Sequence, residues 1–273
     1  MEIKLNTKPK NPIIIEGFPG LGLIGTIVTE YLIKHLNAKP IGYMASKQIP
    51  PMIAIHDSKV IQPLEIFYAK QKNIVILHAL TDVRGFEWEI SEALQELYKT
   101  LKAKEIVSIE GIIGQTQEMN MYYYSQNPNA LRKFLKVKAT PLKEGIVAGV
   151  TAALLLKEKE LKMSGLFVET HSKLPDSKAS AKIIQMLDAY LDLDVDYKPL
   201  EKAAEDFENQ NEDRNLNLLL SLLCLVLLSF QFLYQCNNQR PHGIHLHLFQ
   251  LAQVYNLLLD FPQKPIFYQF PDR

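Results

Sequence analysis

Four glycines lie close together near the start of the chain, in the stretch EGFPGLGLIG at residues 16–25. Three of them, Gly20, Gly22 and Gly25, have the spacing of the dinucleotide-binding fingerprint, Gly-x-Gly-x-x-Gly. In that fingerprint the glycines let the backbone approach a pyrophosphate at the N-terminus of a helix. The apolar residues 13–15 predict a strand before the glycines, and an amphipathic helix is predicted after them, so the local context also fits nucleotide binding.

The fingerprint also places an acidic residue at the end of the second strand, where it binds the ribose hydroxyls. That strand is predicted at about 41–45, and the residues after it are Ser46, Lys47 and Gln48, so no carboxylate is offered. Lys47 could instead meet a 2′-phosphate. The other interpretation is a structural turn or a partner surface, because glycines also allow two chain segments to approach closely. The residues of this glycine turn are Gly17, Phe18, Pro19, Gly20, Gly22 and Gly25.

Charged residues follow several predicted strands at their carboxyl ends. They are Glu16, Asp82, Glu110 and Glu169, accompanied by Arg84 and His171. Ligands of open α/β sheets bind outside these strand ends, so the carboxylates could hold a metal ion or act as general acid and base. They could equally cap the helices that follow and interact with the positive helix ends. The sequence has no Gly-x-Ser-x-Gly, His-Glu-x-x-His or Gly-Lys-Ser/Thr motif, and without a nucleophile motif no reaction can be named.

The elements that would position these residues alternate between strand and helix. Apolar runs predict strands at 13–15, 40–45, 73–80, 105–109, 119–124 and 164–169. Helices are predicted directly after the glycine turn and at 86–103, 128–135, 145–156, 177–191 and 199–210. This alternation predicts an α/β fold, a mostly parallel sheet flanked by helices on both faces. An antiparallel hairpin at 52–68, turning at 57–58, is expected as an insertion at one edge, with Pro63 marking an edge position or a bulge.

Two of the predicted helices have distinctive faces. The first is expected to bury Leu23, Ile24, Ile27, Val28, Tyr31 and Leu32, and to carry Thr26, Thr29, Glu30 and Lys34 on the opposite face. The segment GIVAGVTAALLL at 145–156 is almost wholly apolar and rich in small residues. It predicts a buried helix that is too short to span a bilayer.

The composition excludes several classes of protein. Of the 273 residues, 47% are hydrophobic and 22% are charged, as in ordinary soluble globular proteins. A formal net charge of +0 argues against a nucleic-acid-binding protein, which needs a strongly basic face. The N-terminal residues contain no apolar signal segment, so a cytoplasmic location is expected. Cys224 and Cys236 both follow residue 214, so the main body has no disulfide and no thiolate metal site, and we predict no metal and no cofactor.

The chain is predicted to consist of two parts, an α/β domain at residues 1–210 and an atypical apolar tail at residues 211–273. The tail segment 216–234 has no charged residue and nearly the length of a membrane helix. Glutamines at its distal end and sparse basic flanks argue against a membrane anchor. A frame slip in the source sequence, an unstructured extension and a packed helix are the other interpretations. Membrane contact is therefore predicted only if the segment 216–234 is genuine.

Four motifs follow one another along the chain: EGFPGLGLIG at 16–25, GIIG at 111–114, the small-residue segment at 145–156 and LPDSKA at 174–179. Together they resemble the PAC2 family, the proteasome assembly chaperone 2 family, in its archaeal form, over about residues 10–205. The resemblance implies a single α/β domain, similar in fold to nucleoside phosphorylases, that self-associates into a homo-oligomer. The glycine turn matches the family's glycine motif, to which no catalytic role is attached.

The resemblance further implies an ATP-independent chaperone, not an enzyme, that engages proteasome α subunits or the α ring. Members of the family often bind through a terminal hydrophobic–tyrosine–any tripeptide that enters pockets between α subunits. This chain ends in FPDR at 270–273, and its FYQ at 267–269 is not terminal. The alternative that the residues leave open is a small-molecule or nucleotide-binding enzyme that uses the glycine turn and the carboxylates at the strand ends.

Overall fold

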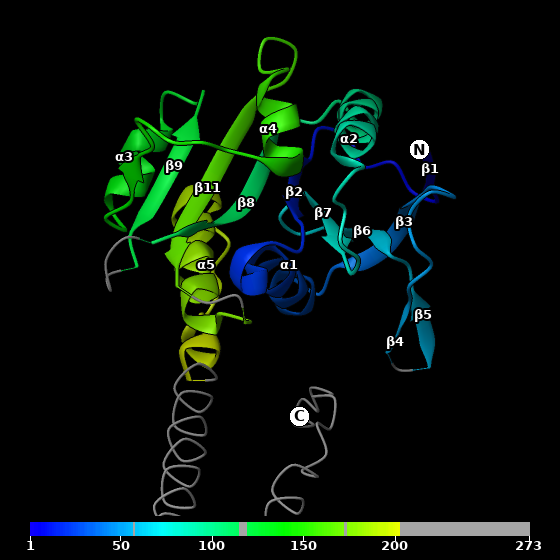
Figure 1. Cartoon of the computed structure of the whole chain (residues 1–273), viewed down its shortest axis with the longest axis horizontal. Helices are drawn as coiled ribbons and strands as arrows, with labels where there is room; N and C mark the ends of the chain where they lie inside the picture. Colours follow the sequence, from blue (N-terminus) through cyan, green and yellow to red (C-terminus); the bar gives the residue numbers. More distant parts are fainter. Residues whose placement is uncertain (57, 115–118, 172–173, 203–273) are drawn as a thin grey trace, which may run out of the picture. The chain divides into compact units, whose positions relative to one another are not determined.

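The computed structural model describes residues 1–56, 58–114, 119–171 and 174–202. Its principal strands are β1 Glu2–Leu5, β2 Ile13–Gly17, β3 Lys39–Ala45, β6 Leu64–Ala69, β7 Ile74–Ala79, β8 Glu105–Ile113, β9 Met121–Ser125, β10 Thr140–Pro141 and β11 Met163–Thr170. Within the described residues these strands form one sheet in the order β1-β3-β6-β7-β2-β8-β11-β9-β10 (Figure 1). Two further strands, β4 Ala54–His56 and β5 Lys59–Ile61, form a small sheet of their own.

The centre of the large sheet is parallel. Strands β7, β2, β8 and β11 are neighbours and run in the same direction. They are buried on both faces, as β7 shows, because all of its residues are buried. Strands β6 and β9 pair antiparallel with the outer members of this group, and β3 and β1 continue the antiparallel flank. The predicted α/β fold with a mostly parallel sheet is therefore confirmed. Its β6-β3-β1 flank is antiparallel, and at the other edge β10 pairs parallel with β9.

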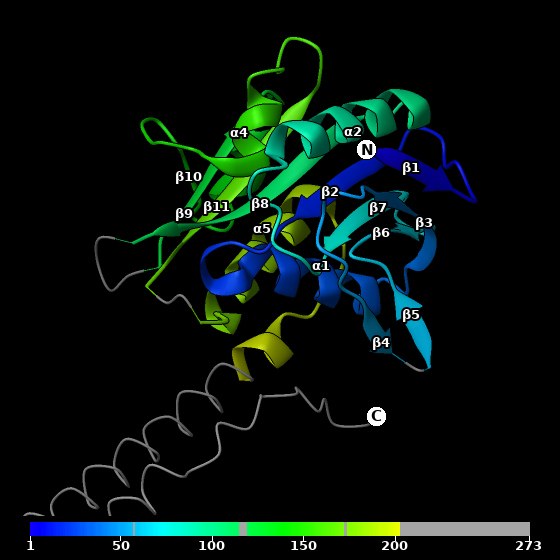
Figure 2. The same cartoon turned by 45° about the vertical axis from the view of Figure 1, so that its right-hand side comes forward.

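Helices cover both faces of the sheet. On one face, α1 Ile24–His35, α3 Ala130–Leu135 and α5 Ser177–Leu191 share a core with Ile15 and Val107. On the other face, α2 Glu87–Leu101 and α4 Gly149–Leu155 share a core with Ile14 and Ile106. Figure 2 shows α2 and α4 on one side of the sheet and α1 and α5 on the other. Successive residues of β2 thus face different helices, as the pleat of a strand requires.

Strand β3, which follows α1 in the sequence, does not lie beside β2. Strands β6 and β7 lie between them, and the parallel neighbours of β2 are β7 and β8. Helix α1 therefore does not connect adjacent parallel strands, as the crossover helix of a dinucleotide-binding unit does. Residues 46–48, which the fingerprint would place at the ribose, follow a strand of the antiparallel flank.

The predicted hairpin forms, but it is shorter than expected. Strand β4 pairs antiparallel with β5, with Ile55 opposite Val60, while residue 57 of the predicted turn lies outside the described residues. The second arm does not continue to residue 68. It stops before Pro63, and β6 then joins the large sheet, because proline lacks the backbone donor that a continuous ladder needs. We call residues 52–56 and 58–61 the β-arm. Its exposed apolar side chains are Met52, Ile53, Ile55 and Val60.

Several details of the helices differ from the predictions. The helix predicted at 145–156 begins only at Gly149, which has φ +79°, because Ala148 before it is extended; Ile146 is 99% exposed. Thr29, predicted on the polar face of α1, is fully buried. Its hydroxyl tolerates burial because it donates to the Gly25 carbonyl at 2.8 Å and is hydrogen-bonded to His78 Nδ1 at 2.9 Å.

Most of the predictions for the C-terminal part of the chain concern residues that the structure does not describe. Of the helix predicted at 199–210, residues 198–202 are helical, and the rest lies outside the described residues. The tail at 211–273, including the segment 216–234, also lies outside them. Strands β1 and β10, by contrast, were not predicted, because both are short edge strands without a clear apolar pattern.

Candidate functional site

The glycine turn connects β2 to α1 through a short 3-10 turn at Leu21–Leu23. A Cβ atom on Gly17 would lie 2.4 Å from the Gly25 carbonyl oxygen, and one on Gly25 would lie 2.7 Å from the Phe18 carbonyl oxygen. Both distances are too short for real Cβ atoms. The backbones of strand and helix are therefore in direct contact here, and the lack of a side chain at both positions allows it.

Gly22 packs against the entry of α5. It has φ +65°, in the left-handed region that favours glycine, and a Cβ atom on it would lie 3.2 Å from Thr170 Oγ1. The backbone N–H of Asp176 donates to the Gly22 carbonyl at 2.9 Å. The Asp176 carboxylate accepts from the Thr170 hydroxyl at 2.7 Å and from the Ala179 N–H at 2.9 Å, which caps α5. Protein side chains thus fill the space beside Gly22.

The remaining motifs join the same unit. A Cβ atom on Gly111 would lie 2.4 Å from the Leu21 carbonyl oxygen, so β8 also contacts the glycine turn through its backbone. The small-residue helix α4 is connected to β8 because the Thr151 hydroxyl donates to the Glu110 carboxylate at 2.7 Å. The four motifs singled out in the sequence therefore meet at the carboxyl ends of β2, β8 and β11.

Glu16 and Glu110 lie on the face of the sheet that α2 and α4 cover, and we call them the acid pair. Glu16 is opposite Ser108 on β8, and Glu110 is the next residue of β8 on that face. The Glu16 side chain is fully buried, and neither its two carboxyl oxygens nor the Ser108 hydroxyl has a hydrogen-bond partner. Glu110 is half-buried next to the exposed Gly20, on which a Cβ atom would lie 3.7 Å from Glu110 Oε2.

This environment makes both carboxyls weak acids. Burial raises the pKa of Glu16 to about 8, and the negative charge of Glu110 adds to the rise. The nearby Ser108 hydroxyl favours the ionised form of Glu16 and lowers its pKa, although its geometry does not complete a hydrogen bond. Burial raises the pKa of Glu110 to about 7, against the opposing effect of the Thr151 hydroxyl. The acid pair therefore titrates near neutral pH, because the charged forms lose their hydration.

The other acidic residues of the predicted site have different partners. Glu169 accepts hydrogen bonds from the backbone and side-chain nitrogens of Asn120, at 3.1 and 2.8 Å, and from the Tyr122 hydroxyl at 3.1 Å. Asp82 and Arg84 form an ion pair at the surface, and hydrogen bonding to Arg84 lowers the pKa of Asp82. Neither group is hydrogen-bonded to the acid pair.

His171 is exposed and lies against Gly114, where a Cβ atom would be 2.4 Å from the His171 Cε1 atom. In the described part of the chain no three His, Cys, Asp or Glu side chains come close enough together to hold a metal ion. Two surface hollows lie elsewhere, one of about 220 Å³ between β1 and α2 and one of about 430 Å³ beside α3 and α5. No helix among the described residues is long and apolar enough to cross a membrane.

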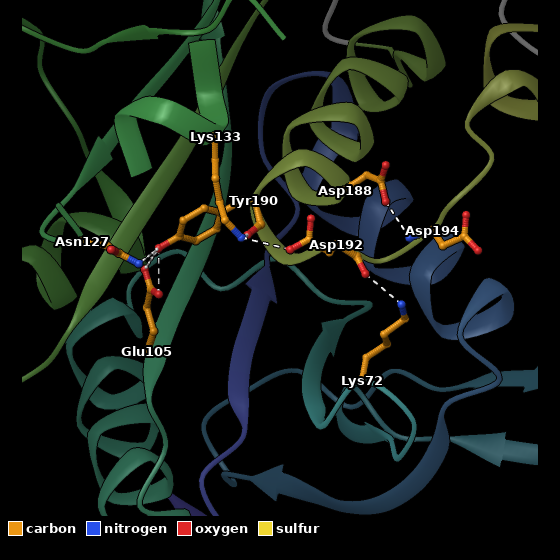
Figure 3. Close-up of polar contacts among 8 residues, drawn as sticks. All are labelled: Lys72, Glu105, Asn127, Lys133, Asp188, Tyr190, Asp192 and Asp194. Carbon is orange, nitrogen blue, oxygen red and sulfur yellow. Dashed lines mark hydrogen bonds and ion pairs between the residues drawn. The ribbon is translucent and has the colours of Figure 1, made fainter. Parts of the chain in front are cut away.

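A second polar cluster, which the sequence did not suggest, lies at the opposite ends of the central strands (Figure 3). The Tyr190 hydroxyl donates to the Glu105 carboxylate, with oxygen distances of 2.8 and 2.9 Å, and accepts from the Asn127 amide at 3.0 Å. Lys133 donates to the Tyr190 carbonyl and pairs with Asp192 at 3.1 Å. These bonds connect β8, α3 and α5. No sequence motif marks them, because the partners are far apart along the chain.

The model of the PAC2 family matches residues 14–213, a range that includes the glycine turn, Gly111 and Asp176. The chain belongs to the PAC2 family. The four motifs that suggested this family are thus the same segments that meet at the carboxyl ends of the central strands.

Two solved structures similar to this PAC2 protein come from Pyrococcus furiosus. PbaA of Pyrococcus furiosus, described as an archaeal homolog of proteasome-assembly chaperone, is 27% identical, with a TM-score of 0.73 over 85% of this chain and 99% of that chain. PbaB of the same organism, described as an archaeal proteasome activator, shares the fold at 20% identity, with a TM-score of 0.67 over 78% of this chain and 98% of that chain. An uncharacterized protein of Methanocaldococcus jannaschii is 29% identical over 204 residues, which are 74% of this chain and 84% of that protein.

Proposed function

We propose that this PAC2-family protein is a non-catalytic chaperone of proteasome assembly that acts in the cytoplasm and binds proteasome α subunits or the α ring. The observation that carries the proposal is the similarity to PbaA, which extends over 85% of this chain and 99% of that chain. The glycine turn supports a structural role, because its neighbours fill the space around Gly17, Gly22 and Gly25. We further propose that the protein is a homo-oligomer.

We assign the contact with α subunits to the β-arm. Ile55 and Val60 face each other across the arm and are 72% and 53% exposed, and Ile53, which precedes β4, is 54% exposed. A two-stranded hairpin by itself is only marginally stable, so its uncovered apolar face gains from burial against a partner. Apolar side chains at the centre of a contact surface are also typical of stable protein interfaces.

Native mass spectrometry of the full chain mixed with α subunits of the same source tests this assignment. We expect a defined complex with the wild type and at least a ~10-fold loss of affinity for the double variant Ile55→Asp, Val60→Asp, because a charge in the centre of an interface must be desolvated. Ile146→Asp is the matched control, since Ile146 is 99% exposed outside the β-arm. The absence of any complex with the wild type would reject the chaperone proposal.

The same experiment separates the two partners that the β-arm could have. If the β-arm variant keeps its affinity for α subunits but loses its own oligomeric state, then the β-arm is a contact between copies of this chain, and our assignment is wrong. If both properties are unchanged, the β-arm is not a binding surface for either partner.

The acid pair favours a second candidate function, a small-molecule or nucleotide-binding enzyme, because carboxyls that titrate near neutral pH are typical of active sites. Thermal-shift measurements with NAD(P), ATP, nucleosides and divalent metal ions test it. We expect no saturable increase in melting temperature, since protein atoms already occupy the space around Gly17, Gly22 and Gly25. A ligand at 100 times its Kd would stabilise the protein by about 2.7 kcal/mol, so specific binding would be easy to detect.

A further inference from the structure

The proposed docking function does not explain why two carboxyl groups lie beneath the glycine turn. Glu16 is fully buried, and both of its oxygens and the adjacent Ser108 hydroxyl lack a hydrogen-bond partner. Buried polar groups are normally bonded, and buried charges are normally paired, because the loss of hydration is costly. An ionised Glu16 would carry this cost in full, whereas a protonated Glu16 would be neutral.

In the described part of the chain, the groups that face Glu16 include no positive charge to offset its ionisation. Strand β7 contributes Leu77, and β8 contributes Ser108 and Glu110. Helix α4 contributes Thr151, whose hydroxyl is bonded to Glu110. The apolar core on this face of the sheet includes Phe18 of the glycine turn, Ile90 and Leu94 of α2, and Val150 and Leu154 of α4. Of all these residues only Glu110 titrates, and its negative charge opposes the ionisation of Glu16.

We propose that the acid pair is a proton-dependent switch: while it holds a proton, the glycine turn and α4 stay packed on the ends of β2 and β8, and when both carboxyls ionise this layer loosens. Two like charges that have lost part of their hydration repel each other and attract water. Water can enter beside Gly20, which is exposed and adjacent to the half-buried Glu110. The loosening therefore begins in residues 17–25 and in α4, while the Glu105–Tyr190 cluster at the opposite strand ends stays closed.

The direction of the pH effect follows from proton binding. An ordinary glutamate has a pKa of 4.5, whereas that of Glu16 is about 8 in the folded protein. Between these values the folded protein holds a proton that the unfolded chain has released, so the free energy of unfolding decreases as the pH rises through this window. The contribution is fully present below pH 4.5 and is lost as the pH passes about 8. Glu110, with a pKa of about 7, acts in the same direction.

Melting temperatures of the full chain between about pH 6 and about pH 9 test the switch. We expect the melting temperature of the wild type to fall across this range and that of Glu16→Gln to fall much less, because glutamine cannot ionise. Glu92→Gln is the matched control, since Glu92 is an exposed carboxylate on α2, and it should follow the wild type. Above about pH 8 the Glu16→Gln variant should melt at a higher temperature than the wild type.

Amide hydrogen exchange, corrected for its intrinsic pH dependence, locates the change. In the wild type we expect protection of residues 17–25 and 149–155 to fall with rising pH, while protection around Glu105 and Tyr190 is kept; in Glu16→Gln it should stay constant. Equal pH slopes for the wild type and Glu16→Gln would overturn the proposal, as would a uniform loss of protection. If Glu16→Gln does not fold, then Glu110→Gln and a carbon-13 NMR titration of the wild-type glutamate carboxyls replace it. The absence of any carboxyl that titrates above about pH 6 would then refute the switch.

Discussion

Replacing Gly17 by alanine is expected to destabilise the fold by about 3 kcal/mol or more, as overpacking at a site that cannot relax does. The new Cβ atom would lie 2.4 Å from the Gly25 carbonyl oxygen and 2.7 Å from its carbonyl carbon. Both are backbone atoms at the start of α1, so no side-chain rotation can relieve the overlap. The change should therefore force α1 away from β2. Urea denaturation followed by circular dichroism measures the loss.

Gly20→Ala is the matched control within the same turn. A Cβ atom on Gly20 would have Glu110 Oε2 as its nearest neighbour, at 3.7 Å, which is an ordinary van der Waals contact with a flexible side chain. Its φ of −148° is extended backbone that alanine adopts without strain. We expect a change of less than about 1 kcal/mol for this variant. Equal stabilities of Gly17→Ala and Gly20→Ala would show that the strand and helix are not in backbone contact.

Replacing Asp176 by alanine should have the second-largest effect, about 2 kcal/mol or more, because one carboxylate serves two elements. It caps α5 through the Ala179 N–H and accepts the Thr170 hydroxyl of β11. Its removal leaves the first turn of α5 without a cap and the partly buried Thr170 hydroxyl without this acceptor. The backbone hydrogen bond from the Asp176 N–H to the Gly22 carbonyl would remain, but the segment that donates it would be held less firmly in place.

Asp176→Asn separates the two contributions. An amide oxygen can still cap α5, so this variant should retain most of the helix stability, and it should lose the part that depends on the charged acceptor of the Thr170 hydroxyl. Urea denaturation gives the free energy of unfolding for both variants. If Asp176→Ala were as stable as the wild type, the glycine turn and the entry of α5 would not be stabilised by this residue.

Local patterns in the sequence were sufficient to predict most of the elements. The apolar period of α5 predicted its bounds at 177–191, and the structure has Ser177–Leu191. The continuous apolar run at 73–80 predicted a strand covered on both faces, and every residue of β7 is buried. Such features follow from the sequence because side-chain periodicity and the burial of apolar surface act within a single segment.

The pairing of strands was not determined locally. Strand β3 follows β2 in the sequence, but β6 and β7 lie between them in the sheet. The second arm of the hairpin predicted at 52–68 is also interrupted at Pro63, and its distal part is β6 of the large sheet. Strand order depends on contacts between distant segments, and many orders satisfy the same pattern of apolar residues. The burial of Thr29 on α1 has the same cause, since its partner His78 lies on the distant strand β7.

In the candidate site, too, some features follow from the sequence alone and others from contacts between distant segments. The sequence by itself determined that carboxylates follow several strands and that glycines close the first turn. Only the tertiary structure decided that Glu16 and Glu110 share one face beneath that turn, that Glu169 is bonded instead to β9, and that Asp176 packs against Gly22. The physical reason is that the sequence of a strand determines how far along the strand a side chain lies. Which side chains surround it depends on the face of the sheet to which it points and on which strands are adjacent.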